Sequence, residues 1–248
     1  MRPQTSYLIC ATPRCGSYLL CEALRNTGIA SRPDEFFYPD TAASWRERWG
    51  VATDAEFLAK AIEAGSTPNG VFGAKVMWGY FDDFVRKLRR LPGAARRAPL
   101  PELLSAVFPN LAYVWITRRD KVRQAVSHWR AAQTNVWVWG GGERQEAQAP
   151  AFDFKQIDRL VRQSQAQDRA WQRFFVAHRI VPFVVVYEEL AEAYEATAMQ
   201  VLHFLHIPAP DDLVFGERSL KRQADDLSES WVEQYHSAKR ARKWWWFV

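Results

Sequence analysis

A short loop near the N-terminus has the residue types that bind phosphate or sulfate groups. An apolar stretch, Tyr7–Ala11, runs into Thr-Pro-Arg-Cys-Gly-Ser and then into a helical pattern. Backbone N–H groups at the start of a helix lack partners, and the helix dipole favours an anion there. Gly16 lets the backbone approach a ligand closely, and Arg14 adds a permanent positive charge. The alternative is an ordinary strand-to-helix turn with Ser17 as the N-cap of the helix.

A second anion site is predicted at the end of a later strand. Leu111–Thr117 is apolar and ends at Arg118, and Ser127 lies about two turns into the following helix. Ligands of open parallel sheets bind beyond the carboxyl ends of the strands, so Arg118 is expected at the same edge as Arg14. An arginine and a helix serine can together hold a second phosphate. The alternative is a plain helix start, with Asp120 as its cap and a surface arginine.

Motifs typical of several other enzyme classes are absent from the sequence. The loop lacks the Gly-x-x-x-x-Gly-Lys-Ser/Thr spacing of nucleoside triphosphatases and therefore the lysine that contacts the β- and γ-phosphates. No Gly-x-Gly-x-x-Gly, Gly-x-Ser-x-Gly or His-Glu-x-x-His occurs. Cys10, Cys15 and Cys21 have poor spacing for metal ligands, so no metal site is expected.

The elements that must position both loops follow from the apolar pattern. Strands are predicted at Tyr7–Ala11, Val71–Val76, Leu111–Thr117 and Phe183–Tyr187. Helices are predicted at Ser17–Asn26, Phe81–Leu91, about 120–133, Asp153–His178 and Glu189–Leu205. The last strand is so uniformly apolar that no solvent-exposed face is expected for it. Apolar strands that alternate with helices imply an α/β fold, with a parallel sheet covered by helices on both faces.

Composition fits one globular domain over residues 1–248. The chain is 48% hydrophobic and 25% charged, which excludes a disordered or fibrous protein. No apolar run approaches the ~20 residues that span a bilayer, and no signal peptide is recognisable, so no integral membrane segment is expected. An odd number of cysteines favours a reducing, cytoplasmic compartment. The net charge of +5 suggests an anionic partner, but no nucleic-acid module accompanies it, so no nucleic acid is expected.

The two loops, in this order, resemble those of sulfotransferases that use 3′-phosphoadenosine 5′-phosphosulfate (PAPS). The chain is more closely similar to the bacterial trehalose 2-sulfotransferase family. Further blocks carry the resemblance, at Arg32–Phe37, Thr67–Trp78, Gln124–Trp137, Leu220–Ala224 and Trp231–Tyr235. The likeness extends over roughly residues 6–236. Residues 237–248, basic and rich in tryptophan, have no counterpart in it and are expected to be mobile or to lie at an interface.

The resemblance implies a P-loop-like parallel sheet and transfer of a sulfuryl group from PAPS to a hydroxyl of a small acceptor, most simply a carbohydrate such as trehalose. The other product is adenosine 3′,5′-bisphosphate, and no metal takes part. It implies that the 5′-phosphosulfate is cradled by Pro13, Arg14, Cys15, Gly16, Ser17 and Tyr18. It also implies that the 3′-phosphate and the rest of the nucleotide contact Arg118, Ser127, Arg222 and Gln223. A homodimer is expected by the same resemblance.

Glu35 matches the glutamate taken as the catalytic base of the family. In an in-line displacement it would take the proton of the acceptor hydroxyl, while Arg14 stabilises the charge on the leaving phosphate oxygen. The resemblance also carries acceptor contacts to Lys75, Trp78, Gln133 and Trp137. His128 is the rival base, but it follows Ser127 directly, and a helix turns it about 100° away. It is expected to be structural or exposed.

Two residues of the first loop depart from the family pattern. Cys15 stands where the family usually has serine, and a thiol is a poor hydrogen-bond donor. Tyr18 stands where it usually has threonine and adds bulk beside the phosphates. These departures favour an alternative function, a non-catalytic 3′-phosphonucleotide-binding or assembly protein that retains the fold. A kinase or nucleoside triphosphatase is a third possibility, and the missing lysine argues against it.

Overall fold

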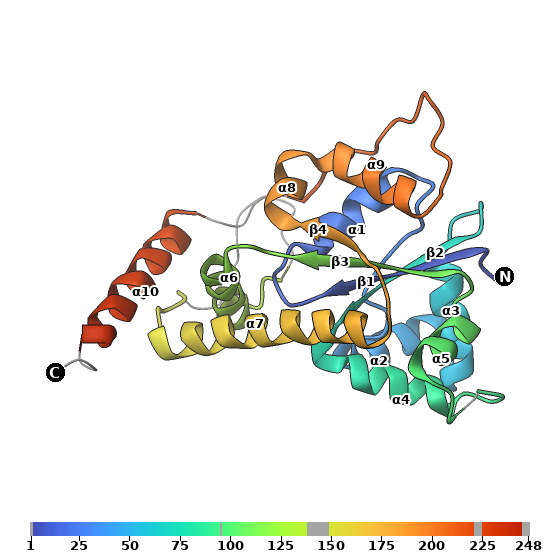
Figure 1. The fold of residues 1–248 in the computed structure, drawn as a ribbon, viewed down its shortest axis with the longest axis horizontal. Coiled ribbons are helices and arrows are strands. Elements are labelled where there is room, and N and C mark those ends of the chain that lie inside the picture. The colour runs from blue at the N-terminus through green and yellow to red at the C-terminus, as the bar shows by residue number, and fades with distance from the viewer. Residues whose placement is uncertain (1, 95, 138–148, 221–224, 245–248) are drawn as a thin grey trace.

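The computed structural model describes residues 2–94, 96–137, 149–220 and 225–244. Within them, a parallel sheet lies between helices on both faces (Figure 1). The strand order is β2-β1-β3-β4, formed by β1 (Thr5–Ala11), β2 (Val71–Met77), β3 (Leu111–Thr117) and β4 (Phe183–Val186). All neighbours are parallel, so the carboxyl ends of the strands lie at one edge. The predicted α/β fold class is confirmed.

The edge strand β4 differs from its prediction. The two strands β1 and β2 are buried along nearly their whole length, as expected for apolar strands between two helix layers. Val184 of β4, in contrast, has an exposed fraction of 47%, so the expectation of a strand without a solvent-exposed face was wrong. β4 pairs with β3 at the edge of the described sheet, and it ends at Val186 because Tyr187 begins a helix.

Helices precede and follow the strands in alternation. They are α1 (Ser17–Asn26), α2 (Pro39–Trp49), α3 (Asp54–Gly65), α4 (Phe81–Arg90), α5 (Leu100–Val107), α6 (Lys121–Thr134), α7 (Phe154–Ala177), α8 (Tyr187–Glu192), α9 (Tyr194–Phe204) and α10 (Asp226–Trp244), with a 3₁₀ turn η1 (Trp78–Tyr80). The helix predicted at Glu189–Leu205 is two helices, because Ala193 leaves the helical conformation (φ −122°, ψ 60°). The sequence prediction did not include α2, α3, α5 and α10.

Different helices cover the two faces of the sheet. In Figure 1, α1, α8 and α9 gather on one side, and α4, α5 and α7 lie on the other. Helix α7 is fixed to the sheet by Trp171, which is fully buried. Its indole N–H donates to the carbonyl of Ala11 at 2.9 Å. This bond ties α7 to the end of β1, where the first loop begins.

Helix α10 packs on α6 and α7, at the end of the molecule away from β2 (Figure 1). Its buried Trp231, Val232 and Tyr235 form a small apolar cluster with these two helices. Part of the segment predicted as a mobile or interfacial tail continues this helix, and Lys239 pairs with the buried Asp158 at 2.5 Å. Residues 245–248 lie outside the described residues.

Candidate active site

The loop between β1 and α1 needs glycine at position 16. Gly16 has φ +93°, and a Cβ built there would lie 2.2 Å from Cδ2 of Tyr187. It is also the N-cap of α1, which starts at Ser17, and in the described part of the chain no side chain makes a capping hydrogen bond there. The alternative of an ordinary turn capped by Ser17 is therefore wrong. The helix start faces the cleft without a capping side chain, as an anion site requires.

Polar side chains behind the loop hold it in place. The Gln124 amide of α6 donates to the carbonyl of Pro13 at 2.7 Å and to Oγ1 of Thr12 at 3.0 Å. The buried Asp168 of α7 pairs with Lys121 at 2.5 Å and accepts from Thr12 at 3.5 Å. The sequence analysis gave neither residue a role: Gln124 was only the first residue of the block Gln124–Trp137, and Asp168 lies inside a helical pattern. Their bonds fix the loop before any ligand binds.

The two predicted anion sites meet at the side chain of Arg14. Its Nε donates to Oγ of Ser127 at 3.0 Å, and its guanidinium also donates to the carbonyl of Trp137. The Arg118 guanidinium lies nearby, 4.5 Å from the ring centroid of Tyr187. Burial and the charge of Arg118 lower the pKa of Arg14 to about 10, so Arg14 still carries its charge at neutral pH. The structure therefore shows one joined cationic region where the sequence predicted two sites.

A cleft of about 1340 Å³ opens at this edge of the sheet. The predicted residues that line it are Pro13, Arg14, Gly16, Ser17, Tyr18, Glu35, Arg118, Ser127 and Trp137. Tyr38, Asp40, Tyr80 and Tyr187 line it as well and were not predicted. Tyr187 had a usable signal, because it is the last residue of the predicted strand Phe183–Tyr187 and so lies at its carboxyl end.

Three residues predicted to contact the acceptor are not among those that line the cleft, so an acceptor contact by them stays a prediction. Lys75 is fully buried, and Trp78 packs edge-on against Trp171 with ring centroids 5.0 Å apart. The Gln133 amide exchanges two hydrogen bonds with the backbone of Ala151, at 2.9 and 3.1 Å. These side chains face the protein interior or a neighbouring segment, so they support the walls of the cleft.

Of the three remaining residues predicted to bind the donor nucleotide, the structure describes one, Cys15. The Cys15 side chain is buried, and burial raises the pKa of its thiol, which keeps it neutral. The backbone N–H of Cys15 bonds to the carbonyl of Thr12 at 3.3 Å and so closes the turn. Arg222 and Gln223 lie outside the described residues.

Glu35 lies on the wall of the cleft, between three polar partners. Its Oε2 pairs with Nζ of Lys75 at 2.8 Å and accepts from the Tyr18 hydroxyl at 3.3 Å. Its Oε1 accepts from the Tyr80 hydroxyl at 3.0 Å. The segment before Glu35 is held to β2, because the backbone N–H of Lys75 donates to the backbone carbonyl of Asp34 at 2.9 Å. The carboxylate is thus fixed in direction, with an exposed fraction of 13% toward the cleft.

Lys75 supplies the positive charge in this cluster. Burial alone would lower the pKa of Lys75, but the charge of Glu35 and the neighbouring Cys21 and Tyr18 raise it overall. The ammonium also lies 3.1 Å from the ring centroid of Tyr18, a cation–π contact. Tyr18, which departs from the family pattern, therefore contacts both members of the ion pair.

His128 is half-buried and lines the cleft, so it is not exposed, and a structural role for it stays a prediction. Its ring lies 5.8 Å from that of Trp137, on the side of the cleft where Arg14 lies. Burial and the charges of Arg14 and Arg159 lower the pKa of His128 to about 4. The imidazole is therefore neutral at physiological pH.

We expect the His128 ring to titrate near pH 4 in the folded protein, against an ordinary value of 6.5. Between these two values the unfolded chain binds more protons than the fold, so stability falls as the pH drops from about 6.5 toward 4. His128→Gln should weaken this dependence. NMR titration of the ring and urea unfolding across this window test both statements. A midpoint near 6.5 would contradict them.

A scan against family models matched residues 6–238 to the Stf0 sulphotransferase model. The chain belongs to the Stf0 sulphotransferase family. The trehalose 2-sulfotransferase of Mycolicibacterium smegmatis (strain ATCC 700084 / mc(2)155) is 31% identical over 93% of this chain and 94% of the relative. That of Mycobacterium tuberculosis (strain ATCC 35801 / TMC 107 / Erdman) is 29% identical, with the same coverage. Among solved structures, the sulfotransferase domain of the Synechococcus PCC 7002 olefin synthase has a TM-score of 0.44 and 13% identity, and covers 96% of this chain and 89% of that chain.

This protein is accordingly a sulfotransferase. Its three cysteines are buried and unpaired. Across the described residues, no cluster of three or more His, Cys, Asp or Glu side chains is arranged to hold a metal ion. Within the same part of the chain, every helix is too short or too polar to cross a bilayer.

Proposed function

We propose that this sulfotransferase moves a sulfuryl group from PAPS to a hydroxyl of a small sugar, with trehalose as the first candidate. One observation carries the proposal: the glycine loop at the start of α1 and the Glu35 carboxylate face the same cleft. The loop and Arg14 fit an anionic donor, because the start of α1 and the Arg14 guanidinium face the same cleft. The curated relatives are named for trehalose, which makes it the acceptor to test first.

The donor supplies an activated sulfuryl group on a phosphate oxygen. The acceptor oxygen forms a bond to sulfur while the bond from sulfur to that phosphate oxygen breaks, and the bonding electrons stay on the leaving phosphate. Backbone N–H groups at the start of α1 and the charge of Arg14 stabilise the leaving oxygen. Glu35 accepts the proton of the acceptor hydroxyl, and Lys75, Tyr18 and Tyr80 hold its carboxylate in direction.

The acceptor end of the cleft offers aromatic rings and a carboxylate, which suit a sugar. The Tyr38 hydroxyl donates to Oδ2 of Asp40 at 2.5 Å, and both line the cleft beside Glu35. The partly exposed Trp137 lines it too. Flat rings pack against C–H faces of sugars, and carboxylates accept their hydroxyl groups.

The decisive experiment is incubation with sulfur-labelled PAPS and a panel of trehalose, glucose and simple alcohols. We expect labelled trehalose together with adenosine 3′,5′-bisphosphate. Binding of adenosine 3′,5′-bisphosphate without any sulfated product across the panel would instead indicate a non-catalytic binding protein. ATP binding with hydrolysis would indicate a kinase or nucleoside triphosphatase.

We expect Lys75→Met to lower kcat about tenfold, because Glu35 loses the ion pair that directs its carboxylate. Methionine cannot replace this pair, so only the Tyr18 and Tyr80 hydroxyls still hold Glu35. The matched control is Lys60→Met on α3, because Lys60 pairs with Glu63 at the same distance of 2.8 Å but both side chains are exposed. A kcat equal to that of the wild type would contradict the role given to Lys75.

A homodimer in the cytoplasm is also proposed for this sulfotransferase. The proposal for the dimer rests on the family resemblance, and that for the location rests on the three unpaired cysteines. Light scattering at micromolar concentration tests the first, and a single monomeric species would contradict it.

A further inference from the structure

A buried carboxylate on α1 has no part in the mechanism above. Glu22 has an exposed fraction of only 5%, and it lies on the helix that the phosphate loop starts. Its Oε1 accepts from the backbone N–H of Ser219 at 2.7 Å, from the Ser219 hydroxyl at 2.5 Å and from the backbone N–H of Leu220 at 2.9 Å. Buried carboxylates are costly unless they are paired in this way, so these bonds fix the two segments to each other.

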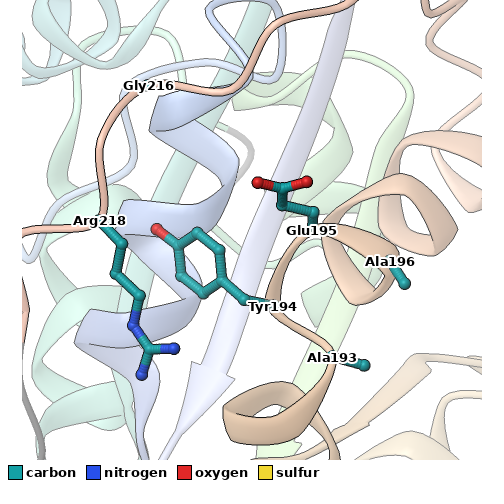
Figure 2. A pocket seen from close by; sticks show the side chains of 6 residues that line it. All are labelled: Ala193, Tyr194, Glu195, Ala196, Gly216 and Arg218. Carbon is teal, nitrogen blue, oxygen red and sulfur yellow. The ribbon is translucent and has the colours of Figure 1, made fainter.

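The segment that Glu22 holds crosses α1 and is here named the strap, residues 216–220. A second helix residue, Asn26, anchors its first half: its amide donates to the carbonyl of Glu217 at 3.0 Å, and its carbonyl accepts from the N–H of Gly216 at 2.8 Å. Figure 2 shows the strap with Gly216 and Arg218 beside Tyr194 of α9. Burial and the neighbouring Glu22 raise the pKa of the Tyr194 hydroxyl, which keeps it protonated as a donor.

Arg218 is the residue through which the strap reaches the cleft. Its guanidinium lies 5.0 Å from the ring centroid of Tyr194, and Figure 2 shows it directed along that ring. On one side it lines a small pocket of about 430 Å³ with Tyr194 and Glu195. On the other side Arg218 and Leu220 line the large cleft. Arg218 adds a permanent charge to the cleft that Arg14 and Arg118 also line.

We propose that Glu22 is a positioning residue for the donor nucleotide: it fixes the strap to the phosphate-loop helix and thereby places Arg218 against the phosphates of the donor. The inference rests on the proposed function, because it assigns Arg218 to a phosphorylated nucleotide. Helix α1 then contributes to two parts of the donor site. Gly16 at its start cradles one end of the nucleotide, and Glu22 anchors the strap that carries Arg218. Loss of the carboxylate leaves two backbone N–H groups and a hydroxyl of the strap without their acceptor.

The test is calorimetric binding of adenosine 3′,5′-bisphosphate to the full chain. For Glu22→Leu we expect Kd to rise about tenfold, the size of one lost charge-assisted hydrogen bond. Arg218→Ala should raise Kd by at least the same factor, because Glu22 is proposed to act through this side chain. Arg218 is exposed, so folding is not at risk. In both variants the KM for the acceptor should stay near the wild-type value, because Glu35 and Asp40 lie on another part of the wall.

The matched control is Tyr7→Phe. The Tyr7 hydroxyl donates to the carbonyl of Ala30 at 2.6 Å and contacts Oγ of Ser31 at 2.7 Å, so it too anchors a segment after α1 from a buried position. It does not line the cleft, and its loss should lower stability without changing Kd.

The outcomes separate this inference from the proposed function. A wild-type protein that does not bind the bisphosphate overturns the proposed function and the inference with it. If the wild type binds but a folded Glu22→Leu variant has the same Kd, only the role of Glu22 is overturned. If Glu22→Leu does not fold, Arg218→Ala decides, and an unchanged Kd in that variant rejects the proposal.

Discussion

Replacement of Glu35 by glutamine is expected to lower turnover by about 10²–10⁴-fold, because the amide cannot take the proton of the acceptor hydroxyl. The shape of the side chain is kept: its one carbonyl oxygen still accepts from one of the Tyr18 and Tyr80 hydroxyls, and its amide group donates to the oxygen of the other. The measurement is kcat with saturating donor and acceptor. Near-normal turnover would reject Glu35 as the base, whatever else the cleft binds.

Because Glu35 pairs with Lys75, a second variant is needed to separate the loss of catalysis from a loss of stability. Lys75 is fully buried, so Glu35→Gln removes its counter-charge and is expected to cost roughly 3–5 kcal/mol of unfolding free energy. The double variant Lys75→Met/Glu35→Gln removes both charges and should recover much of that stability without recovering turnover. Glu63→Gln, in the exposed pair with Lys60, is the control, and we expect it to change stability by less than about 1 kcal/mol and turnover not at all.

Gly16→Ala is expected to weaken binding of adenosine 3′,5′-bisphosphate by at least about tenfold and to cost roughly 1–3 kcal/mol of stability. Alanine is strained at φ +93°, and its Cβ would lie 2.2 Å from the Tyr187 ring, which must then move away from Arg118. We therefore expect the loop at Gly16 and the Arg118 guanidinium, which contacts the Tyr187 ring, to shift together. Calorimetry gives the first quantity, and denaturant unfolding gives the second.

Gly28→Ala separates backbone strain from the collision with Tyr187. Gly28 also has a positive φ, +70°, but nothing lies within 4 Å of the Cβ that alanine would add. We expect a comparable loss of stability and an unchanged Kd for the bisphosphate. Equal Kd values for the Gly16→Ala variant and the wild type would show that the loop does not cradle the donor.

Local patterns predicted the strands and the loop well. The bounds of β3 and α1 agree with their predictions residue for residue, because apolar periodicity and the glycine turn are properties of short stretches of sequence. The break at Ala193 was missed, since Glu189–Leu205 keeps a helical pattern across it and no glycine or proline marks the kink.

Contacts between distant segments could not be predicted in the same way. Lys75 was taken for an acceptor contact, because nothing in its neighbourhood shows that it pairs with a residue forty positions earlier. That pairing depends on a bridge between Asp34 and Ala74, which places the Glu35 segment beside β2. Tyr80 was missed for the same reason: its hydroxyl reaches Glu35 only after the chain has turned at η1.

The polar residues behind the first loop explain how that loop tolerates unusual side chains. Gln124 and Asp168 hold Thr12 and the Pro13 carbonyl from behind, and none of these three bonds involves the side chains at positions 15 and 18. The loop backbone can therefore keep its shape with a cysteine and a tyrosine at these positions, because its support comes from α6 and α7 behind it.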